Sequence, residues 1–218
     1  MIDFATARTT MVDCQVRPSD VTKYPIIEAL LAIPREEFVP EQRKAVAYSG
    51  AHLDLGAGRV LLDARTFAKM LEAANIQPDE MVLDLGCGLG YSSAIIAHMA
   101  EAVICVEENE ELAAEATNIL AANSVDNAVV ITAPLTEGAP KHGPYDVIIT
   151  EGAVEDIPDA LLSQIKEGGR IVTIVVQGNR GDCMVGFKHG DQIDWRRSFA
   201  ATAPVLAGFE KKPEFKFN

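Results

Sequence analysis

The sequence predicts an α/β fold: a Rossmann-like, mostly parallel seven-stranded sheet with a C-terminal antiparallel hairpin and an N-terminal helical lid. Two observations carry this prediction. Short apolar runs alternate with helical stretches after residue 80, and the alternation stops near the end of the chain. Strands that alternate with helices imply right-handed crossovers and a parallel sheet. The length of 218 residues fits one domain of this kind.

Five apolar runs rich in Val and Ile supply the parallel strands. They show little alternation of polar and apolar residues, which is typical of strands buried on both faces. The runs are Met81–Leu85, Ala102–Val106, Ala128–Thr132, Asp146–Thr150 and Arg170–Val176. The helices predicted between them are Ser92–Ala100, Asn109–Ala122 and Ile157–Ile165. An antiparallel hairpin follows, because Met184–Lys188 and Ile193–Phe199 flank a polar turn at residues 189–191.

The first 76 residues lack such runs and are predicted to be helical. Thr22–Ala32 and Thr66–Ala74 carry apolar residues at helical spacing, and Pro34 ends the first of these segments. We therefore expect residues 1–76 to form a helical lid that packs on the same domain. Residues 77–218 are expected to form the Rossmann-like core.

Composition and charge exclude several classes of partner. The net charge of −13 repels phosphate backbones, which argues against nucleic acid. No pair of cysteines forms C-x-x-C and no His lies beside one at ligand spacing, so no metal site is predicted. No apolar run is long enough to span a bilayer, and the N-terminus lacks a signal-peptide pattern. We expect a cytoplasmic protein without membrane contact, either a monomer or a weak homodimer.

A glycine-rich loop follows the first strand of the core. Residues 82–93 read V-L-D-L-G-C-G-L-G-Y-S-S. Glycines allow a ligand to approach the backbone closely, because a Cβ would block it. The spacing is G-x-G-x-G, and Tyr91 stands where the dinucleotide fingerprint has its third glycine, which argues against a nicotinamide oxidoreductase.

Two acids accompany this loop. Glu107 ends the second strand, where a carboxylate can accept hydrogen bonds from both ribose hydroxyls, and Glu108 is the alternative. Asp84 lies in the strand before the loop and can orient the amino group of a zwitterionic ligand. Loop and acids, in this order, predict a nucleoside-binding site.

The same stretch resembles motif I of class I S-adenosylmethionine-dependent methyltransferases, and further motifs resemble protein-L-isoaspartate O-methyltransferases. I-P-R-x-x-F-V-P stands at residues 33–40, followed by A-Y at 47–48. P-Y-D-x-I-I stands at 144–149, I-P-x-x-L at 157–161 and G-G-R at 168–170. The resemblance implies an enzyme with S-adenosylmethionine as cofactor, which methylates a carboxylate of damaged aspartyl residues.

The chain differs from the family at two places. The family has G-x-T-I-S, whose Ser helps to position the isoaspartyl carboxylate, where this chain has Gly58-Arg59-Val60-Leu61-Leu62. The family has G-D-G, whose Asp holds the adenine amino group, where this chain has Ala133-Pro134-Leu135. Three alternatives therefore stay open: the isoaspartyl reaction, methylation of another small-molecule or protein acceptor, and a non-catalytic S-adenosylmethionine-binding regulatory domain.

Site residues follow from motifs and resemblance together. The cofactor-binding residues are predicted to be Asp84, Gly86, Cys87, Gly88, Gly90, Tyr91, Glu107, Glu108 and Leu135. The catalytic candidates, expected where open α/β sheets bind ligands at the carboxyl ends of strands, are Asp63, Arg65, Thr150 and Glu151. Arg59 and Arg65 are candidates to clamp a carboxylate, and Glu151 is a candidate base or partner of a cationic amine.

Overall fold

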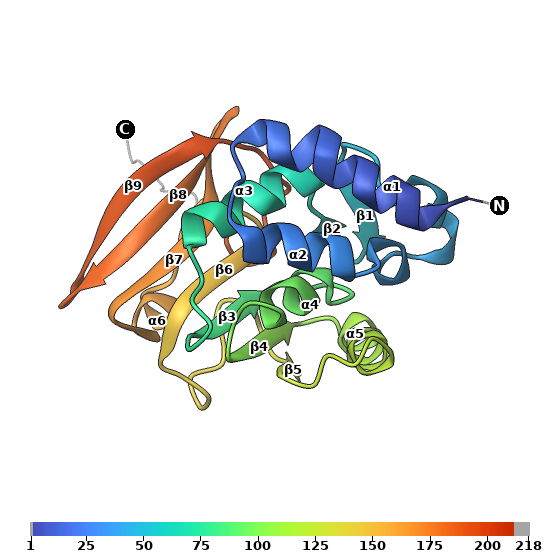
Figure 1. Cartoon of the computed structure of the whole chain (residues 1–218). Coiled ribbons are helices and arrows are strands. Elements are labelled where there is room, and N and C mark those ends of the chain that lie inside the picture. The colour runs from blue at the N-terminus through green and yellow to red at the C-terminus, as the bar shows by residue number, and fades with distance from the viewer. Residues whose placement is uncertain (1, 212–218) are drawn as a thin grey trace, which may run out of the picture.

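The computed structural model describes residues 2–211, and its centre is a seven-stranded sheet in the order β5-β4-β3-β6-β7-β8-β9 (Figure 1). Neighbours from β5 to β7 are parallel, whereas β8 and β9 are antiparallel. The strands are β3 (Met81–Leu85), β4 (Ala102–Glu107), β5 (Ala128–Thr132), β6 (Tyr145–Val154), β7 (Ile165–Gln177), β8 (Arg180–His189) and β9 (Gln192–Ala200). The predicted fold class is confirmed.

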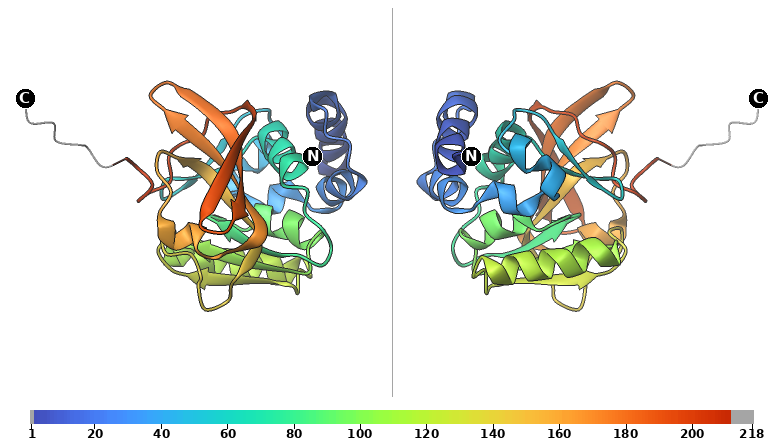
Figure 2. Two further views of the ribbon diagram at one scale, coloured as in Figure 1. Left: turned by 90° about the vertical axis from the view of Figure 1, so that its left-hand side faces the viewer. Right: turned by 90° about the vertical axis from the view of Figure 1, so that its right-hand side faces the viewer.

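Helices cover one face of the sheet. They are α1 (Phe4–Met11), α2 (Tyr24–Ala32), α3 (Ala64–Ala74), α4 (Tyr91–Ala97) and α5 (Glu110–Ala122). A π-helical turn and three 3-10 turns lie at Val12–Val16, Arg17–Ser19, Arg35–Phe38 and Glu41–Val46. The other face is covered by the short helix α6 (Asp159–Leu162) and by the chain around Leu206 and Phe209. Figure 2 shows the N-terminal helices on one side of the molecule and β8 and β9 on the other.

The N-terminal helices share one apolar core with the sheet. Leu30 of α2 and Phe67 of α3 belong to the same buried cluster as Val82 of β3 and Ile95 of α4. Their apolar side chains recur every three or four residues, so each helix presents one stripe to the sheet. The segment that sequence analysis assigned to a lid therefore lies directly against the glycine loop's own helix.

Three expectations of local structure were wrong. The predicted helix at 157–165 shrinks to α6, because Pro158 caps its start and Ile165 already begins β7. The run at 128–132 is not buried on both faces: it is the edge strand β5, and Val129 is 53% exposed. A small antiparallel hairpin, β1 (Leu53–Gly56) and β2 (Arg59–Leu61), was not predicted at all.

The order of the strands fixes the place of a ligand. The chain moves outward from β3 to β4 and β5, then returns to the other side of β3 as β6. Ligands of open α/β sheets bind at such a switch point, outside the carboxyl ends of the strands. Leu85 of β3 pairs with Thr150 of β6 there. Within residues 2–211 no helix has the length and apolarity needed to cross a membrane.

Candidate cofactor and acceptor site

The glycine loop turns sharply between β3 and α4. Gly86, Gly88 and Gly90 have φ of +80°, +56° and +89°, a region that residues with a Cβ rarely adopt. The turn is closed by two backbone hydrogen bonds, from the Gly86 amide to the Val106 carbonyl and from the Gly90 amide to the Cys87 carbonyl, both of 2.8 Å. The local sequence alone therefore dictates a loop whose backbone a ligand can approach.

Asp84 lies buried beneath this loop with one free oxygen. Its Oδ2 accepts hydrogen bonds of 2.7 Å from the hydroxyls of Ser92 and Ser93, whereas Oδ1 has no partner among the described residues. Burial raises the pKa of Asp84 to about 6, and the charge of Glu107 acts in the same direction, while the two serine hydroxyls oppose the shift. The unpartnered Oδ1 is an acceptor for a donor that the chain itself does not supply.

Glu107 ends β4 beside the loop and is fully buried. Its carboxylate accepts the backbone amides of Gly88 and Asn109, each at 3.0 Å. It also accepts the Arg59 Nε at 3.0 and 3.2 Å, and the same guanidinium reaches Glu108 at 2.9 Å. The two acids predicted to bind ribose thus share one partner, Arg59. This arginine lies in the β1–β2 hairpin, which the sequence did not predict.

Apolar side chains lie against the glycines. A Cβ added to Gly88 would stand 2.7 Å from Leu55 Cδ1, and one added to Gly86 would stand 3.3 Å from Leu206 and 3.5 Å from Leu135. Leu135, predicted to bind the cofactor, therefore lies close to the loop. Leu55 belongs to β1, so the small hairpin contributes both an apolar and a charged contact to this region.

The residue types fit S-adenosylmethionine. A positive-φ loop, a buried acid with a free oxygen and an acid at the end of the next strand offer a backbone surface, an ammonium acceptor and a ribose acceptor. In the conformation described, the space is closed by Leu55 over Gly88 and by Arg59 on Glu107. The donor set suits the cofactor, and the hairpin lies against both the loop and Glu107.

Arg35 joins the lid to the loop and was not singled out as a site residue by sequence analysis. It is completely buried, and it donates to the carbonyls of Ala47 at 2.7 Å and Leu62 at 2.6 Å. Its guanidinium lies 4.8 Å from the centroid of the Tyr91 ring, a cation–π contact with the residue that replaces the third glycine. Arg35 is the arginine of the I-P-R motif, so the sequence drew attention to this position. The residues that Arg35 contacts lie on other segments of the chain and could not be predicted.

Thr150 and Glu151 are interior residues of β6. The Thr150 hydroxyl is engaged by Thr173 Oγ1 at 2.7 Å and by the Gly152 carbonyl at 3.0 Å. Glu151 is 4% exposed and its Oε1 has no partner among the described residues. Burial raises the pKa of Glu151 well above its usual value, the Asp84 charge adds to the shift, and the Arg35 charge opposes it. Glu151 therefore faces the interior, within range of the Asp84 charge.

Asp63 and Arg65 lie in a different place. Asp63 caps α3, its Oδ1 accepting the Thr66 amide at 2.9 Å, and Arg65 is the exposed second residue of the helix. Both line an open cavity of about 710 Å³ together with His52 and Lys69. The four predicted catalytic residues thus divide into an interior pair and a cavity pair. The expected joint clamp by Arg59 and Arg65 is wrong, because Arg59 is paired with Glu107 and Glu108.

This sheet order, with a glycine loop after β3 and an acid at the end of β4, defines the class of Rossmann-like S-adenosylmethionine-dependent methyltransferases. The family model for Protein-L-isoaspartate(D-aspartate) O-methyltransferase (PCMT) matches residues 8–201. The chain therefore belongs to the protein-L-isoaspartate O-methyltransferase family. The predicted family, cofactor and enzyme class are confirmed, whereas the individual site residues remain predictions.

Two relatives agree with this assignment. A protein-L-isoaspartate O-methyltransferase of Koribacter versatilis (strain Ellin345) is 38% identical over 169 residues, which cover 78% of this chain and 76% of the relative. Protein-L-isoaspartate O-methyltransferase 2 of Nitrosococcus oceani is 32% identical and covers 86% of each chain.

Two solved structures share the fold. One protein-L-isoaspartate O-methyltransferase superposes with a TM-score of 0.82 at 22% identity, covering 92% of this chain and 66% of the longer one. A second, from Plasmodium falciparum and in complex with S-adenosyl-L-homocysteine, gives 0.78 at 16% identity and covers 94% of this chain and 99% of its own.

Among the described residues, no three or more His, Cys, Asp and Glu side chains gather closely enough to hold a metal ion.

Proposed function

We propose that this enzyme methylates a side-chain carboxylate of damaged aspartyl residues in proteins or peptides, with the cofactor held by Asp84, the glycine loop and Glu107. The observation that carries the proposal is the free Oδ1 of Asp84, buried beneath a positive-φ loop in a chain of this family. S-adenosylmethionine supplies an electrophilic methyl group on a sulfonium that is already a good leaving group. The chain's own residues have to align and desolvate the two reactants.

Each predicted cofactor residue has a separate task in this proposal. Asp84 Oδ1 accepts from the α-amino group, and the ammonium charge favours the ionised carboxylate against its burial. Gly86, Gly88 and Gly90 let the ligand lie on the backbone. Glu107 accepts from the ribose hydroxyls. Leu135 and Leu206 offer apolar surface beside Gly86 for the base.

A carboxylate acceptor needs no general base, because it attacks in its ionised form. The buried Glu151 is compatible with such an acceptor, because burial raises its pKa well above the usual value and so favours the neutral form, which repels a second carboxylate less. Leu62 offers no hydroxyl to the acceptor, and its carbonyl is already taken by Arg35. The acceptor is therefore positioned by groups other than a hydroxyl at residue 62.

A second acceptor class has one observation in its favour. Asp84 and Glu151 both carry a buried oxygen without a partner among the described residues, and two acids near each other suit a cationic amine. In that case Glu151 would be the group that holds the amine or removes its proton. Val60 and Leu62, which differ from the family pattern, would then define the acceptor pocket.

The remaining expectations form part of the same proposal. We propose that residues 1–76 act as a lid on the core of residues 77–218, of which residues 1 and 212–218 lie outside the part that the structure describes. A net charge of −13 supports a protein, peptide or small-molecule acceptor rather than nucleic acid. We also propose that the enzyme works in the cytoplasm as a monomer or weak homodimer.

An assay with labelled S-adenosylmethionine tests the acceptor. An isoaspartyl peptide, the same peptide with normal aspartate, and a panel of amines are incubated with the enzyme. We expect label on the isoaspartyl peptide alone, as a base-labile ester that releases methanol. Label on an amine, stable to base, would replace the proposal by the second acceptor class. Cofactor binding without labelling of any acceptor would overturn both.

A further inference from the structure

Arg59 is the hairpin's contact with the predicted ribose site. Its side chain is 2% exposed, and that of its partner Glu107 is completely buried. The guanidinium bonds Glu107 through Nε and the partly exposed Glu108 through the NH2 group. A charge-assisted pair shielded from water in this way is strong and specific in geometry. The hairpin is therefore held against the end of β4 by its charge as well as by its apolar contacts.

The hydrogen-bonding capacity of Glu107 is used up in this arrangement. An ionised carboxylate offers about four lone-pair sites. Arg59 Nε contacts both oxygens, the Asn109 amide donates to Oε1, and the Gly88 amide donates to Oε2. The two backbone amides belong to the glycine loop and to the start of α5, and they stay in place. Ribose hydroxyls can thus reach Glu107 only at the positions that Arg59 occupies.

Leu55 closes the neighbouring surface from the same hairpin. Its Cδ1 would lie 2.7 Å from a Cβ on Gly88, so the Leu55 side chain covers this glycine closely. Arg59 Cβ is 3.9 Å from the same point. One structural unit therefore blocks both the ribose acceptor and the approach to the loop.

The hairpin is anchored at its base and along its strands, whereas its tip is unpacked. At its base His52 Nδ1 accepts the Asp63 amide at 2.9 Å, which joins the residues on either side of the two strands. At its tip Gly56, Ala57 and Gly58 all have positive φ, and a Cβ on either glycine would meet nothing within 4 Å. The tip is thus free of packing, whereas Leu53 and Leu61 are buried in the main apolar core, so the site opens by rearrangement of the tip and of the side chains of Leu55 and Arg59 while the base stays in place.

We infer that the β1–β2 hairpin closes the cofactor site, and that S-adenosylmethionine binds only when Arg59 leaves Glu107 and Leu55 withdraws from Gly88. The inference rests on the proposed cofactor role of Glu107 and the glycine loop. Ribose hydroxyls replace the guanidinium on Glu107, and Glu108 remains as an exposed partner for Arg59. The apparent dissociation constant equals that of the open site divided by the fraction of molecules that are open, so the closed state weakens cofactor binding. Arg59 is thus a determinant of cofactor affinity that acts by competition.

Arg59→Met tests the inference, because methionine keeps an unbranched stem without any donor. Calorimetric titration with S-adenosylhomocysteine measures the dissociation constant. We expect the variant to bind about tenfold or more tightly than the parent, since the closed state loses its charge pair. Arg59→Gln is the second variant if Arg59→Met proves too unstable, and the same direction is expected with a smaller factor.

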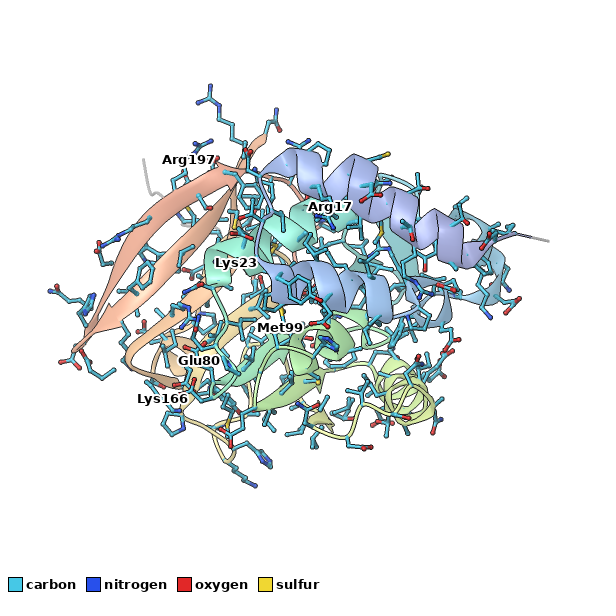
Figure 3. The ribbon with its side chains drawn as sticks, viewed as in Figure 1. Arg17, Lys23, Glu80, Met99, Lys166 and Arg197 are labelled. Carbon is cyan, nitrogen blue, oxygen red and sulfur yellow. The ribbon has the colours of Figure 1, made fainter. Side chains whose placement is uncertain are left out.

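Arg170→Met is the matched control. Arg170 forms another shielded arginine–carboxylate pair, with both NH groups 2.7 Å from Glu80. Glu80 directly precedes β3, at the amino end of the strand and away from the loop (Figure 3). We expect this variant to lose thermal stability as Arg59→Met does, without a change in the dissociation constant.

A measurement on the unmodified chain keeps the inference testable without variants. A crystal structure of its complex with S-adenosylhomocysteine should place the Arg59 guanidinium away from Glu107. An Arg59–Glu107 pair that persists in this complex, or equal or weaker binding by Arg59→Met, would overturn the inference while leaving the cofactor site intact. Failure of the parent and of both Arg59 variants to bind S-adenosylhomocysteine would overturn the proposed cofactor site and the inference together.

Discussion

The glycine loop and the β1–β2 hairpin meet at the Arg59–Glu107 ion pair, yet they are specified in different ways. The loop's conformation is local, since three glycines within five residues supply the positive φ angles it needs. The position of the hairpin is non-local, because Arg59 is held by a carboxylate 48 residues away in the sequence. The surface for the cofactor is thus encoded in one short motif, while access to it depends on a distant segment.

Gly88→Ala, a change in the glycine loop, should cause the largest loss of cofactor affinity. A Cβ there would stand 2.7 Å from Leu55 in the closed form and would occupy the ligand's place in the open one. We expect S-adenosylhomocysteine affinity to fall about 100-fold or more, equivalent to ~2.7 kcal/mol. Gly190→Ala is the control, because Gly190 has φ +60° and open space around its Cβ position. It should lose stability only. Unchanged binding by Gly88→Ala would contradict the placement of the site.

Asp84→Asn tests the buried acid below the loop. Loss of a charged hydrogen bond to the ammonium should weaken S-adenosylhomocysteine binding by roughly 10- to 100-fold, equivalent to about 1.5–3 kcal/mol. Binding is measured by titration calorimetry. Retained affinity would show that the amino group lies elsewhere.

The same substitution changes the dependence of stability on pH. The folded state raises the pKa of Asp84 from 3.8 to about 6, so the folded chain binds the proton more tightly than the unfolded chain. The free energy of unfolding therefore falls as pH rises through this window, by up to ~3 kcal/mol from this group. Urea unfolding of Asp84→Asn from about pH 4 to about pH 8 should show a flatter profile. A fall as steep as that of the parent would contradict this origin.

Leu62→Ser tests the hairpin's role in acceptor binding, because residue 62 directly follows β2. Leu62 is 1% exposed, so the change should destabilise the fold by about 2–4 kcal/mol. If the family's hydroxyl helps to hold the isoaspartyl carboxylate, kcat/KM per folded molecule should rise about tenfold, or ~1.4 kcal/mol. Leu71→Ser, equally buried in α3, is the control for stability. An equal fall in kcat/KM for both variants would show that residue 62 does not contact the acceptor.

Asp63→Ala should give the smallest effect. Asp63 caps α3 through the Thr66 amide, and loss of such a cap costs about 1 kcal/mol. Thermal unfolding measures this loss. The split between kcat and KM on the isoaspartyl peptide then separates the two roles of Asp63: a capping role leaves both constants unchanged, whereas a role in the acceptor cavity raises KM.

Much of the core could be predicted because its signals are local. Val-rich runs predicted the parallel strands, and the glycine spacing with Glu107 predicted a nucleoside-binding site, since strand burial and positive φ are properties of short segments. The cofactor itself followed from the resemblance of this motif to a known family. The errors have equally physical causes. β5 is exposed because nothing pairs with its outer edge among the described residues, and the helix near residue 157 is short because β7 begins at once. Neither fact is encoded in the segment itself.

The sequence by itself determined the sheet, the glycine loop and the family, because each follows from residue types at fixed spacing. Only the tertiary structure decided what those residues touch. It buried Glu151 in the interior, placed Arg35 over the Tyr91 ring, and paired Arg59 with Glu107 instead of placing it beside Arg65. Buried charges must find partners wherever the chain brings them together, and those partners lie on segments far apart in sequence.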